Sequence, residues 1–262
     1  MSEKVAVLGP KGTFTDLAAK KLFKNPETIY YDSVEDVFKF VDEGRGLGVA
    51  AVENSLEGSI RETLESLMNY EKIKICGEVT LDINMCLIKK KGTTEIKHIL
   101  SHPHALAQCR GYLRREYPKA EQHAVESTAT AMQRVTIMKD AAAIGSKETA
   151  EIYGLDVAGE NIQDDFSQTR FISISKKECW GKKTSIIFAV KDEPGALYPL
   201  LKIFSDSNIN LTKIESRPSR KKLGEYVFYV DFENGSLDKA GVEKMLLRIR
   251  ERTTYFKSLG SY

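Results

Sequence analysis

The densest group of polar side chains lies in residues 161–171, which read NIQDDFSQTRF. Thr169 offers a hydroxyl that can donate or accept a hydrogen bond, and Arg170 offers a planar fork that suits a carboxylate. Phe171 opens a β-rich run, FISIS, so we expect these polar groups where a loop enters a strand. Binding and catalytic groups gather at such junctions, because a rigid element positions an accessible loop. The plain alternative is a polar surface turn with an arginine at its rim.

A second candidate follows the first expected strand, residues 5–9. Gly9, Pro10 and Gly12 form a turn signal, and Thr13 can cap the helical run that follows. A strand, a glycine turn and a helix N-terminus together suit an anion. The spacing matches neither G-x-G-x-x-G nor G-x-x-x-x-G-K-[ST], which excludes a nucleotide-binding loop.

Polar residues also follow the expected strand at 48–52. Glu53, Asn54 and Ser55 come directly after it, before the helical run IRETLESLM. The carboxyl end of a strand in an α/β sheet is well placed to face a ligand crevice. The alternative is a plain helix-capping turn.

His102 and His104 have the H-x-H spacing, and Gln108 and Cys109 follow in a helical segment. The pattern invites a metal. No acidic or cysteine ligand accompanies the histidines at metal-site spacing, and a proline separates them, so we predict no metal and no cofactor. We interpret His102 as a loop residue that supports a cleft.

Alternating strand and helix patterns fill the first 160 residues. A Ser33–Asp36 capping box precedes apolar residues at positions 34, 37, 38 and 41, which have helical spacing. Ser127 and Thr128 place hydroxyls at another helix start. Further strands are expected at 28–31, 98–102 and 141–145, and the run 76–91 predicts a long strand that could cross into a second lobe. This alternation favours a mostly parallel α/β architecture.

The pattern changes after a polar, basic run at residues 175–183. Strands are expected at 185–190, 211–215, 226–232 and 254–259, and helices around 197–204 and 237–250. The order is that of a ferredoxin-like domain. Its simplest interpretation is a structural or dimerising module.

Composition excludes several classes of protein. Net charge is +2, from 39 basic and 37 acidic residues, which gives no long-range attraction to nucleic acid or anionic membranes. No apolar run approaches the roughly 20 residues that span a membrane, and no signal peptide is evident. The four cysteines form no C-x-x-C pair, and scattered free cysteines fit a reducing compartment, so we expect a cytoplasmic protein.

Taken in order, the motifs resemble the prephenate dehydratase family: GPKGTFT, ENS with a following glycine, SHPHALAQC, STA, AIGS and TRF. The C-terminal part resembles an ACT domain, a small amino-acid-sensing module. The resemblance covers about residues 4–258. Ser167 stands where the family usually has asparagine, and Ala51 where it generally has proline. The resemblance implies a two-lobed catalytic domain at 1–178, like type II periplasmic binding proteins, and an ACT domain at 184–260.

The family converts prephenate to phenylpyruvate, with loss of carbon dioxide and water, in phenylalanine biosynthesis. Prephenate carries two carboxylates, so the cleft needs fixed donors, which Arg170 and the helix N-termini after Gly12, Glu53 and Ser127 can supply. The C4 hydroxyl leaves as water and needs a hydrogen-bond donor. The resemblance implies that Thr169 is the catalytic residue, and we hypothesise that its hydroxyl is this donor.

The resemblance also implies a substrate-binding set: Gly12, Thr13, Phe14, Glu53, Asn54, Ser55, His102, Gln108, Ser127, Thr128, Arg170 and Phe171. Glu53, His102 and Asp165 remain candidate acids. Phenylalanine is expected as a feedback effector, held at a subunit interface by Gly195, Ala196, Leu197, Glu215, Ser216, Arg217 and Pro218.

Further expectations concern assembly and specificity. ACT domains commonly pair, so a homodimer or homotetramer is expected. The chain starts directly at the first lobe, so we expect a monofunctional enzyme. Arogenate, in which an amine replaces the keto oxygen of prephenate, is a rival substrate. A non-catalytic amino-acid sensor is the rival of a different class, since the same two-lobed fold can bind without reacting.

Overall fold

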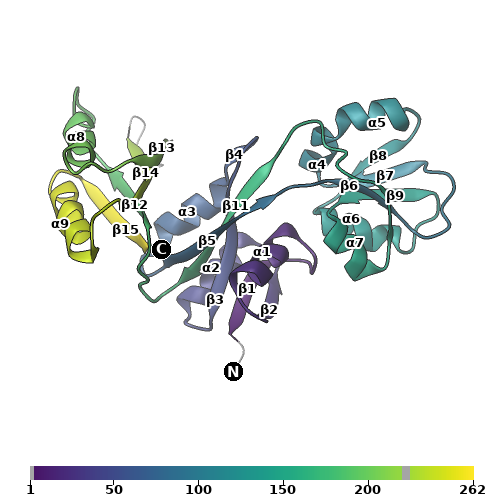
Figure 1. Ribbon diagram of the computed structural model, residues 1–262, viewed down its shortest axis with the longest axis horizontal. Coiled ribbons are helices and arrows are strands. Elements are labelled where there is room, and N and C mark those ends of the chain that lie inside the picture. The colour runs from purple at the N-terminus through teal and green to yellow at the C-terminus, as the bar shows by residue number, and fades with distance from the viewer. Residues whose placement is uncertain (1–2, 220–224) are drawn as a thin grey trace.

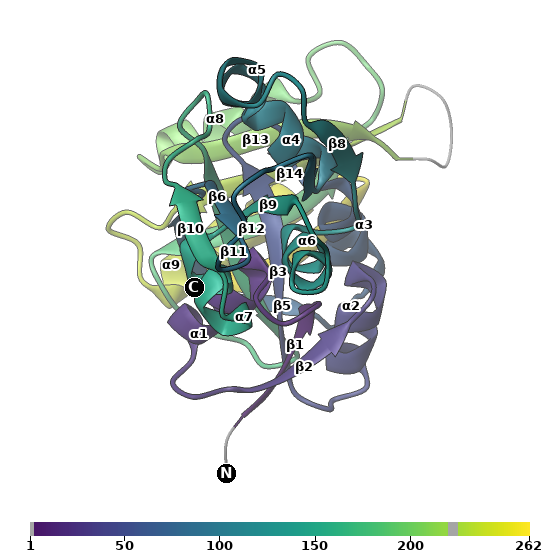
Figure 2. The ribbon, with the colours of Figure 1, turned by 90° about the vertical axis from the view of Figure 1, so that its right-hand side faces the viewer.

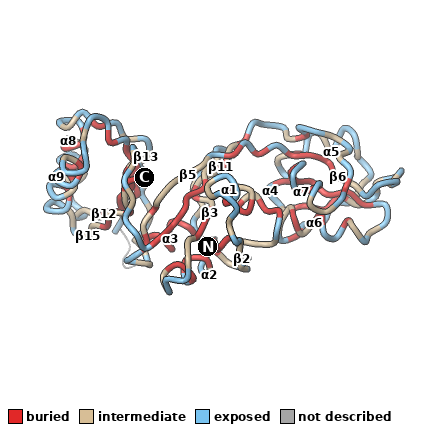
Figure 3. The backbone as a smooth tube through the Cα atoms, turned by 60° about the horizontal axis from the view of Figure 1, so that its bottom comes forward, coloured by how far each residue is buried: buried red, intermediate tan, exposed pale blue. Residues whose placement is uncertain are grey.

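The computed structural model describes residues 3–219 and 225–262, and it has three bodies in a row (Figure 1). The C-terminal domain lies at one end, the first lobe in the middle and the second lobe at the other end. Buried residues gather along the central strands of each body (Figure 3). None of the helices in the described part of the chain is long and apolar enough to cross a membrane.

The first lobe is built on a mixed sheet with the order β2-β1-β3-β11-β5. Its elements are β1 (Lys4–Leu8), α1 (Phe14–Leu22), β2 (Glu27–Tyr31), α2 (Val34–Asp42), β3 (Leu47–Asn54), β4 (Gly58–Ser59), α3 (Arg61–Asn69), β5 (Lys74–Asp82) and β11 (Gln168–Ser175). β1, β2 and β3 are parallel, whereas β11 runs antiparallel to β3 and β5. The Ser33 side chain accepts a hydrogen bond from the Asp36 N–H, which confirms the predicted cap of α2.

The second lobe has the sheet order β10-β6-β9-β7-β8. Its elements are β6 (Cys86–Lys89), β7 (His98–Ser101), α4 (Pro103–Gln108), α5 (Arg110–Glu116), β8 (Glu121–Ala124), α6 (Thr128–Val135), β9 (Ala141–Gly145), α7 (Lys147–Tyr153) and β10 (Asp156–Gly159). α4 and α5 pack on one face of this sheet and α6 on the other (Figure 2). This is the two-lobed α/β arrangement that the sequence predicts, but its sheets are mixed rather than mostly parallel, because β6 runs antiparallel to β9 and β10, as β11 does to β3 and β5.

Two segments connect the lobes, and in both the strand limits differ from those that the sequence predicts. The run 76–91 is not one strand, since β5 ends at Asp82 in the first lobe and β6 begins at Cys86 in the second. The chain returns from β10 into β11. β11 begins at Gln168, so Thr169 and Arg170 lie inside the strand rather than in the loop before it.

The C-terminal domain is an antiparallel sheet of order β13-β14-β12-β15 with two helices. Its elements are β12 (Lys183–Ala189), α8 (Tyr198–Asp206), β13 (Leu211–Pro218), β14 (Tyr226–Glu233), α9 (Lys239–Arg250) and β15 (Tyr255–Ser261), in the predicted ferredoxin-like order. Phe204 and Ile249 of the helices pack on Phe188 on one face of the sheet. Tyr229, on the other face, joins the core of the first lobe, so this sheet is docked on the catalytic unit.

A disulfide joins Cys76 of β5 to Cys179 in the segment between β11 and β12, across 103 residues of sequence. The prediction of scattered free cysteines is therefore wrong for this pair. Cys86 and Cys109 are free and buried. The pairing has no local sequence signal, because it depends on the return of the chain along β5 at the end of β11.

Candidate active site and its link to the C-terminal domain

A β-bulge near the end of β3 decides which of its side chains lie opposite Thr169 and Arg170. Asn54 pairs with Thr169 and Glu53 with Arg170, but Ala51 already pairs with Phe171, which leaves Val52 as the extra residue. A bulge of this kind re-aims the side chains that follow it. Asn54 and Thr169 therefore share one face of the sheet, and Glu53 and Arg170 share the other.

The Asn54 amide fixes the position of the Thr169 hydroxyl. Its Oδ1 accepts hydrogen bonds from the backbone N–H groups of Leu56 and Glu57, at 2.9 and 3.0 Å. The amide nitrogen must then point the other way, and it lies 2.9 Å from Thr169 Oγ1 and 3.0 Å from Ser167 Oγ. Thr169 thus accepts from Asn54, and its own O–H proton is left to donate elsewhere.

Ser55 completes this cluster from the same turn. Its side-chain oxygen accepts from the Gln168 N–H at 2.9 Å, and its N–H donates to the Gln168 carbonyl at 2.8 Å. Ser167, which stands where the family usually has asparagine, is buried. The structure thus brings together the predicted Asn54, Ser55 and Thr169.

The second lobe offers the carboxyl ends of three parallel strands, each followed by a capped helix. His102 follows β7 and caps α4, Ser127 follows β8 and caps α6, and Ser146 follows β9 and caps α7. Helix N-termini concentrate partial positive charge, which suits the carboxylates of a small acid. Thr128 is the first residue of α6 and lies half-buried at the same edge.

The surroundings of His102 favour the neutral imidazole over the imidazolium. Burial, followed by the neighbouring His104, lowers the pKa of His102, against an opposing effect of Glu57. Because His102 Nδ1 accepts from the His104 N–H at 3.3 Å, the neutral ring carries its proton on Nε2.

The Gly12 turn is held by a residue that the sequence does not single out. Asp16 is fully buried, and its carboxylate accepts from the Gly12 N–H at 2.9 Å, from Lys20 and from Tyr30. The Gly12 N–H is therefore not available to an anion. Thr149 of α7 donates to the Gly12 carbonyl at 2.5 Å, so the turn contacts the second lobe. Thr13 caps α1 and is buried, and Phe14 is half-buried.

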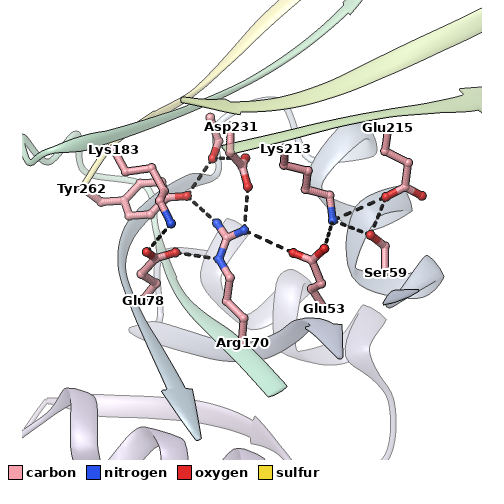
Figure 4. A network of polar contacts seen from close by, with 10 residues as sticks. Glu53, Ser59, Glu78, Arg170, Lys183, Lys213, Glu215, Asp231 and Tyr262 are labelled. Carbon is pink, nitrogen blue, oxygen red and sulfur yellow. Dashed lines mark hydrogen bonds and ion pairs between the residues drawn. The ribbon is translucent and has the colours of Figure 1, made fainter. Parts of the chain in front are cut away.

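Arg170 makes its contacts in the interface with the C-terminal domain (Figure 4). Its Nε lies 2.6 Å from Glu78 Oε2, its Nη1 lies 2.6 Å from Asp231 Oδ2, and its Nη2 donates to the Tyr262 hydroxyl at 2.7 Å. Burial lowers the pKa of Arg170, but Asp231, Tyr262 and Glu78 outweigh that effect and raise it. The sequence prediction placed this fork in the cleft, whereas strand alternation turns it to the face opposite Thr169.

Glu53 extends the same network. It lies 3.6 Å from Arg170 Nη1, and its other oxygen lies 3.0 Å from Lys213 Nζ of β13. Lys213 also lies 3.4 Å from Glu215, which accepts hydrogen bonds from Ser59 of β4 and from Arg217. These hydrogen bonds outweigh the effect of burial and lower the pKa of Glu215. Two expected effector residues, Glu215 and Arg217, thus touch the catalytic unit.

Four of the other expected effector residues line a separate hollow of about 360 Å³ in the C-terminal domain. Gly195, Ala196 and Leu197 form one wall, and Ser216 of β13 forms another. Because strand side chains alternate, Ser216 points to this hollow while Glu215 and Arg217 point to the first lobe. Pro218 ends β13 and is exposed.

The remaining predicted residues lie elsewhere. The Phe171 side chain is 1% exposed and belongs to the core. The Gln108 carbonyl accepts from the Asp164 N–H at 2.7 Å, and Asp165 lies exposed in the loop before β11. Sequence reasoning missed Glu78, Lys183, Lys213, Asp231 and Tyr262. No local signal marks them, because their partners come from distant parts of the chain.

Comparisons with known proteins agree with this architecture. A family profile for prephenate dehydratase matches residues 5–179, and one for the ACT domain matches residues 184–245. A prephenate dehydratase of Methanocaldococcus jannaschii is 45% identical over 275 residues, which cover 100% of this chain and 98% of that protein.

Two solved structures share the fold. The prephenate dehydratase of Arthrobacter aurescens in complex with L-phenylalanine has a TM-score of 0.88 at 30% identity, covering 98% of this chain and 89% of the other. GqqA, described as a novel type of quorum quenching acylase, has a TM-score of 0.86 at 26% identity, covering 98% of this chain and 96% of the other. The family profile spans more than half of the chain and the M. jannaschii protein matches all of it, so the chain belongs to the prephenate dehydratase family, with a C-terminal ACT domain.

Proposed function

We propose that this enzyme converts prephenate to phenylpyruvate between its two lobes, with Thr169 as the donor to the departing C4 hydroxyl. The observation that carries the role of Thr169 is the Asn54 amide, whose orientation is set by two backbone N–H groups. Because Asn54 donates to Thr169 Oγ1, the threonine proton is directed away from Asn54 and toward a ligand. A donor fixed before the reaction needs no reorganisation in the transition state.

The substrate carboxylates are assigned to the second lobe. The helix starts at Ser127 and Ser146 offer backbone N–H groups at one edge of the sheet, whereas α4 begins with Pro103 and its next N–H, that of His104, donates to His102. The neutral His102 supplies a hydrogen bond from Nε2 without a full charge. Decarboxylation is easier when the leaving carboxylate is not over-stabilised by a cation, so dipoles suit this site better than a guanidinium.

Arg170 and Glu53 are assigned to communication with the ACT domain rather than to substrate. Arg170 follows Thr169 in β11, and Glu53 precedes Asn54 in β3. Each of these two interface residues is therefore the direct sequence neighbour of a residue that we place in the cleft. A shift of the ACT sheet would pull on both strands at once. Coupling energies of about 1–3 kcal/mol are typical of such linked sites.

The decisive test is product formation from purified protein. We expect prephenate to yield phenylpyruvate, followed by its absorbance, and added phenylalanine to suppress turnover. Arogenate is the parallel arm, and faster turnover of arogenate would reassign the substrate. Because a protein of the same fold is described as an acylase, the identity of the product must be measured. Tight binding of prephenate without product would favour the interpretation as a non-catalytic sensor.

Phenylalanine is proposed to bind in the hollow between residues 195–197 and Ser216. We expect Ser216→Phe to fill it and abolish suppression by phenylalanine, with turnover in its absence unchanged. Thr212→Phe is the control, because Thr212 is an exposed residue of β13 that does not line the hollow. Dose–response curves of both variants check this. Full suppression in Ser216→Phe would remove the hollow as the effector site.

A homodimer formed through the ACT domains is also proposed, and a pair of dimers would give a tetramer. Within residues 3–219 and 225–262, β13 pairs with β14 on one side only. Tyr198, Ile214 and Leu247 are large apolar side chains that remain exposed on this domain. An unpaired edge beside exposed apolar groups favours pairing with a second copy. We also retain the domain limits 1–178 and 184–260 as proposals. A cytoplasmic location remains a proposal that no longer rests on free cysteines, since Cys76 and Cys179 form a disulfide.

A further inference from the structure

A second constellation of donor groups lies outside the cleft, on the strands β7 and β8 of the second lobe. His98 of β7 directly faces Glu121 of β8, and His123 lies two residues further along β8. Residues two apart on a strand share a face, so both β8 side chains lie beside His98. Among the described residues, these three form the group of donors placed closely enough to hold a metal ion.

The three donor atoms form a nearly equilateral triangle. His98 Nδ1 lies 3.1 Å from His123 Nε2, and Glu121 Oε2 lies 3.5 Å from the former and 3.6 Å from the latter. Zinc ligands at about 2.1 Å in tetrahedral geometry stand roughly 3.4 Å from one another. The triangle therefore has the dimensions of one face of a zinc tetrahedron, and the three side chains are 35–70% exposed, so water can reach the site.

We propose that His98, Glu121 and His123 bind a divalent transition-metal ion of the zinc class, with water as the fourth ligand. Two imidazoles and one carboxylate suit such an ion and disfavour calcium or magnesium, which prefer oxygen ligands. The positive side chain nearest in sequence, Lys97, is held by Glu95 and Asp140 at 3.0 and 3.5 Å. The carboxylate of Glu121 would offset part of the charge of the ion.

The ion would fasten an edge strand. β8 has four residues, all exposed, and within the described chain it pairs with β7 alone. A bridge from Glu121 and His123 to His98 would hold β8 in register against β7. The paired residues His98 and Glu121 begin their strands, whereas Ser127 and α6 follow the other end of β8, so the bridge would act on the pairing of the two strands.

The test is titration of the untagged, chelator-treated full chain with Zn²⁺, followed by calorimetry and by the thermal midpoint. We expect one equivalent to bind at micromolar metal and to raise the midpoint. His123→Gln should weaken binding by more than about 100-fold, beyond the 10–100-fold typical for loss of a group that only supports a ligand.

His104→Gln is the matched control, since it removes an exposed histidine outside the cluster, and we expect it to bind zinc as the wild type does. His98→Gln provides a second ligand variant if His123→Gln fails to fold. Substituting Co²⁺ should give the visible absorption of a four-coordinate ion. The proposal fails if the wild type takes up no zinc at these concentrations, or if His104→Gln loses the ion while both ligand variants keep it.

Discussion

Replacing Thr169 with valine is expected to lower kcat for phenylpyruvate formation by about 10²–10³, the usual cost of removing one transition-state donor. Valine has nearly the same shape, so packing should be preserved. Asn54 keeps two other acceptors, Ser167 Oγ at 3.0 Å and the Gln168 carbonyl at 3.2 Å, so its amide is not stranded. The loss should therefore appear in turnover and not in the thermal midpoint.

Thr169→Ser is the matched control, because it retains the hydroxyl and loses only a methyl group. We expect it to keep most of the activity. The KM of Thr169→Val should change less than kcat, since the donor acts chiefly on the departing oxygen. A valine variant with near-native kcat would overturn the assignment, and a serine variant as impaired as valine would indicate packing rather than donation.

The Asn54–Thr169 pair shows why the sequence could indicate the site but not its geometry. Both residues stand in motifs that the sequence singles out, yet they are 115 positions apart. The bulge at Val52 decides that Asn54, and not Glu53, faces Thr169. A one-residue bulge leaves no clear signature in the run GVAAVEN, where apolar residues simply continue.

Arg170 shows a limit of a different kind. An apolar run beginning at Phe171 suggests that the strand starts there, but the ladder begins at Gln168. Extending the strand by three residues would have placed Thr169 and Arg170 on opposite faces through the two-residue period. The partners of Arg170 lie 61 and 92 residues away, so only the folded chain reveals them.

Helices and the domain order were more accessible, because their signals are local. The caps at Thr13, Ser33 and Ser146 each lie within three residues of the N–H that they accept from. The disulfide and the docking of the ACT sheet depend on contacts between distant segments. Local sequence patterns determine the helices and strands, whereas the contacts between these elements depend on the whole fold.

Arg170→Met is expected to destabilise the enzyme by about 3 kcal/mol, at the lower end of the 3–5 kcal/mol typical for removing one partner of a buried ion pair. The Arg170 side chain is 14% exposed and that of Asp231 is 11% exposed. In the variant, the Asp231 carboxylate would remain largely buried without its cationic partner. The cost stays at the lower end because Glu78 keeps Lys183 at 2.6 Å and Asp231 keeps its hydrogen bond from Ser185. Urea unfolding of the full chain would measure it.

Arg134→Met is the matched control. Arg134 also pairs with a carboxylate, Glu126, but both side chains are largely exposed, and such pairs contribute about 0–1 kcal/mol. In a double-mutant cycle, Arg170→Met with Asp231→Asn should cost less than the sum of the two single changes, since the second change removes the stranded charge.

Kinetics of Arg170→Met separate the two roles open to this arginine. If Arg170 joins the catalytic strands to the ACT sheet, the variant should lose much of its response to phenylalanine while its KM for prephenate stays within a few fold of the wild type. If the guanidinium binds a substrate carboxylate, KM should rise sharply while the response to phenylalanine and the stability are retained. The contacts with Glu78, Asp231 and Tyr262 favour the first outcome, because all three N–H-bearing nitrogens of the fork are already engaged there.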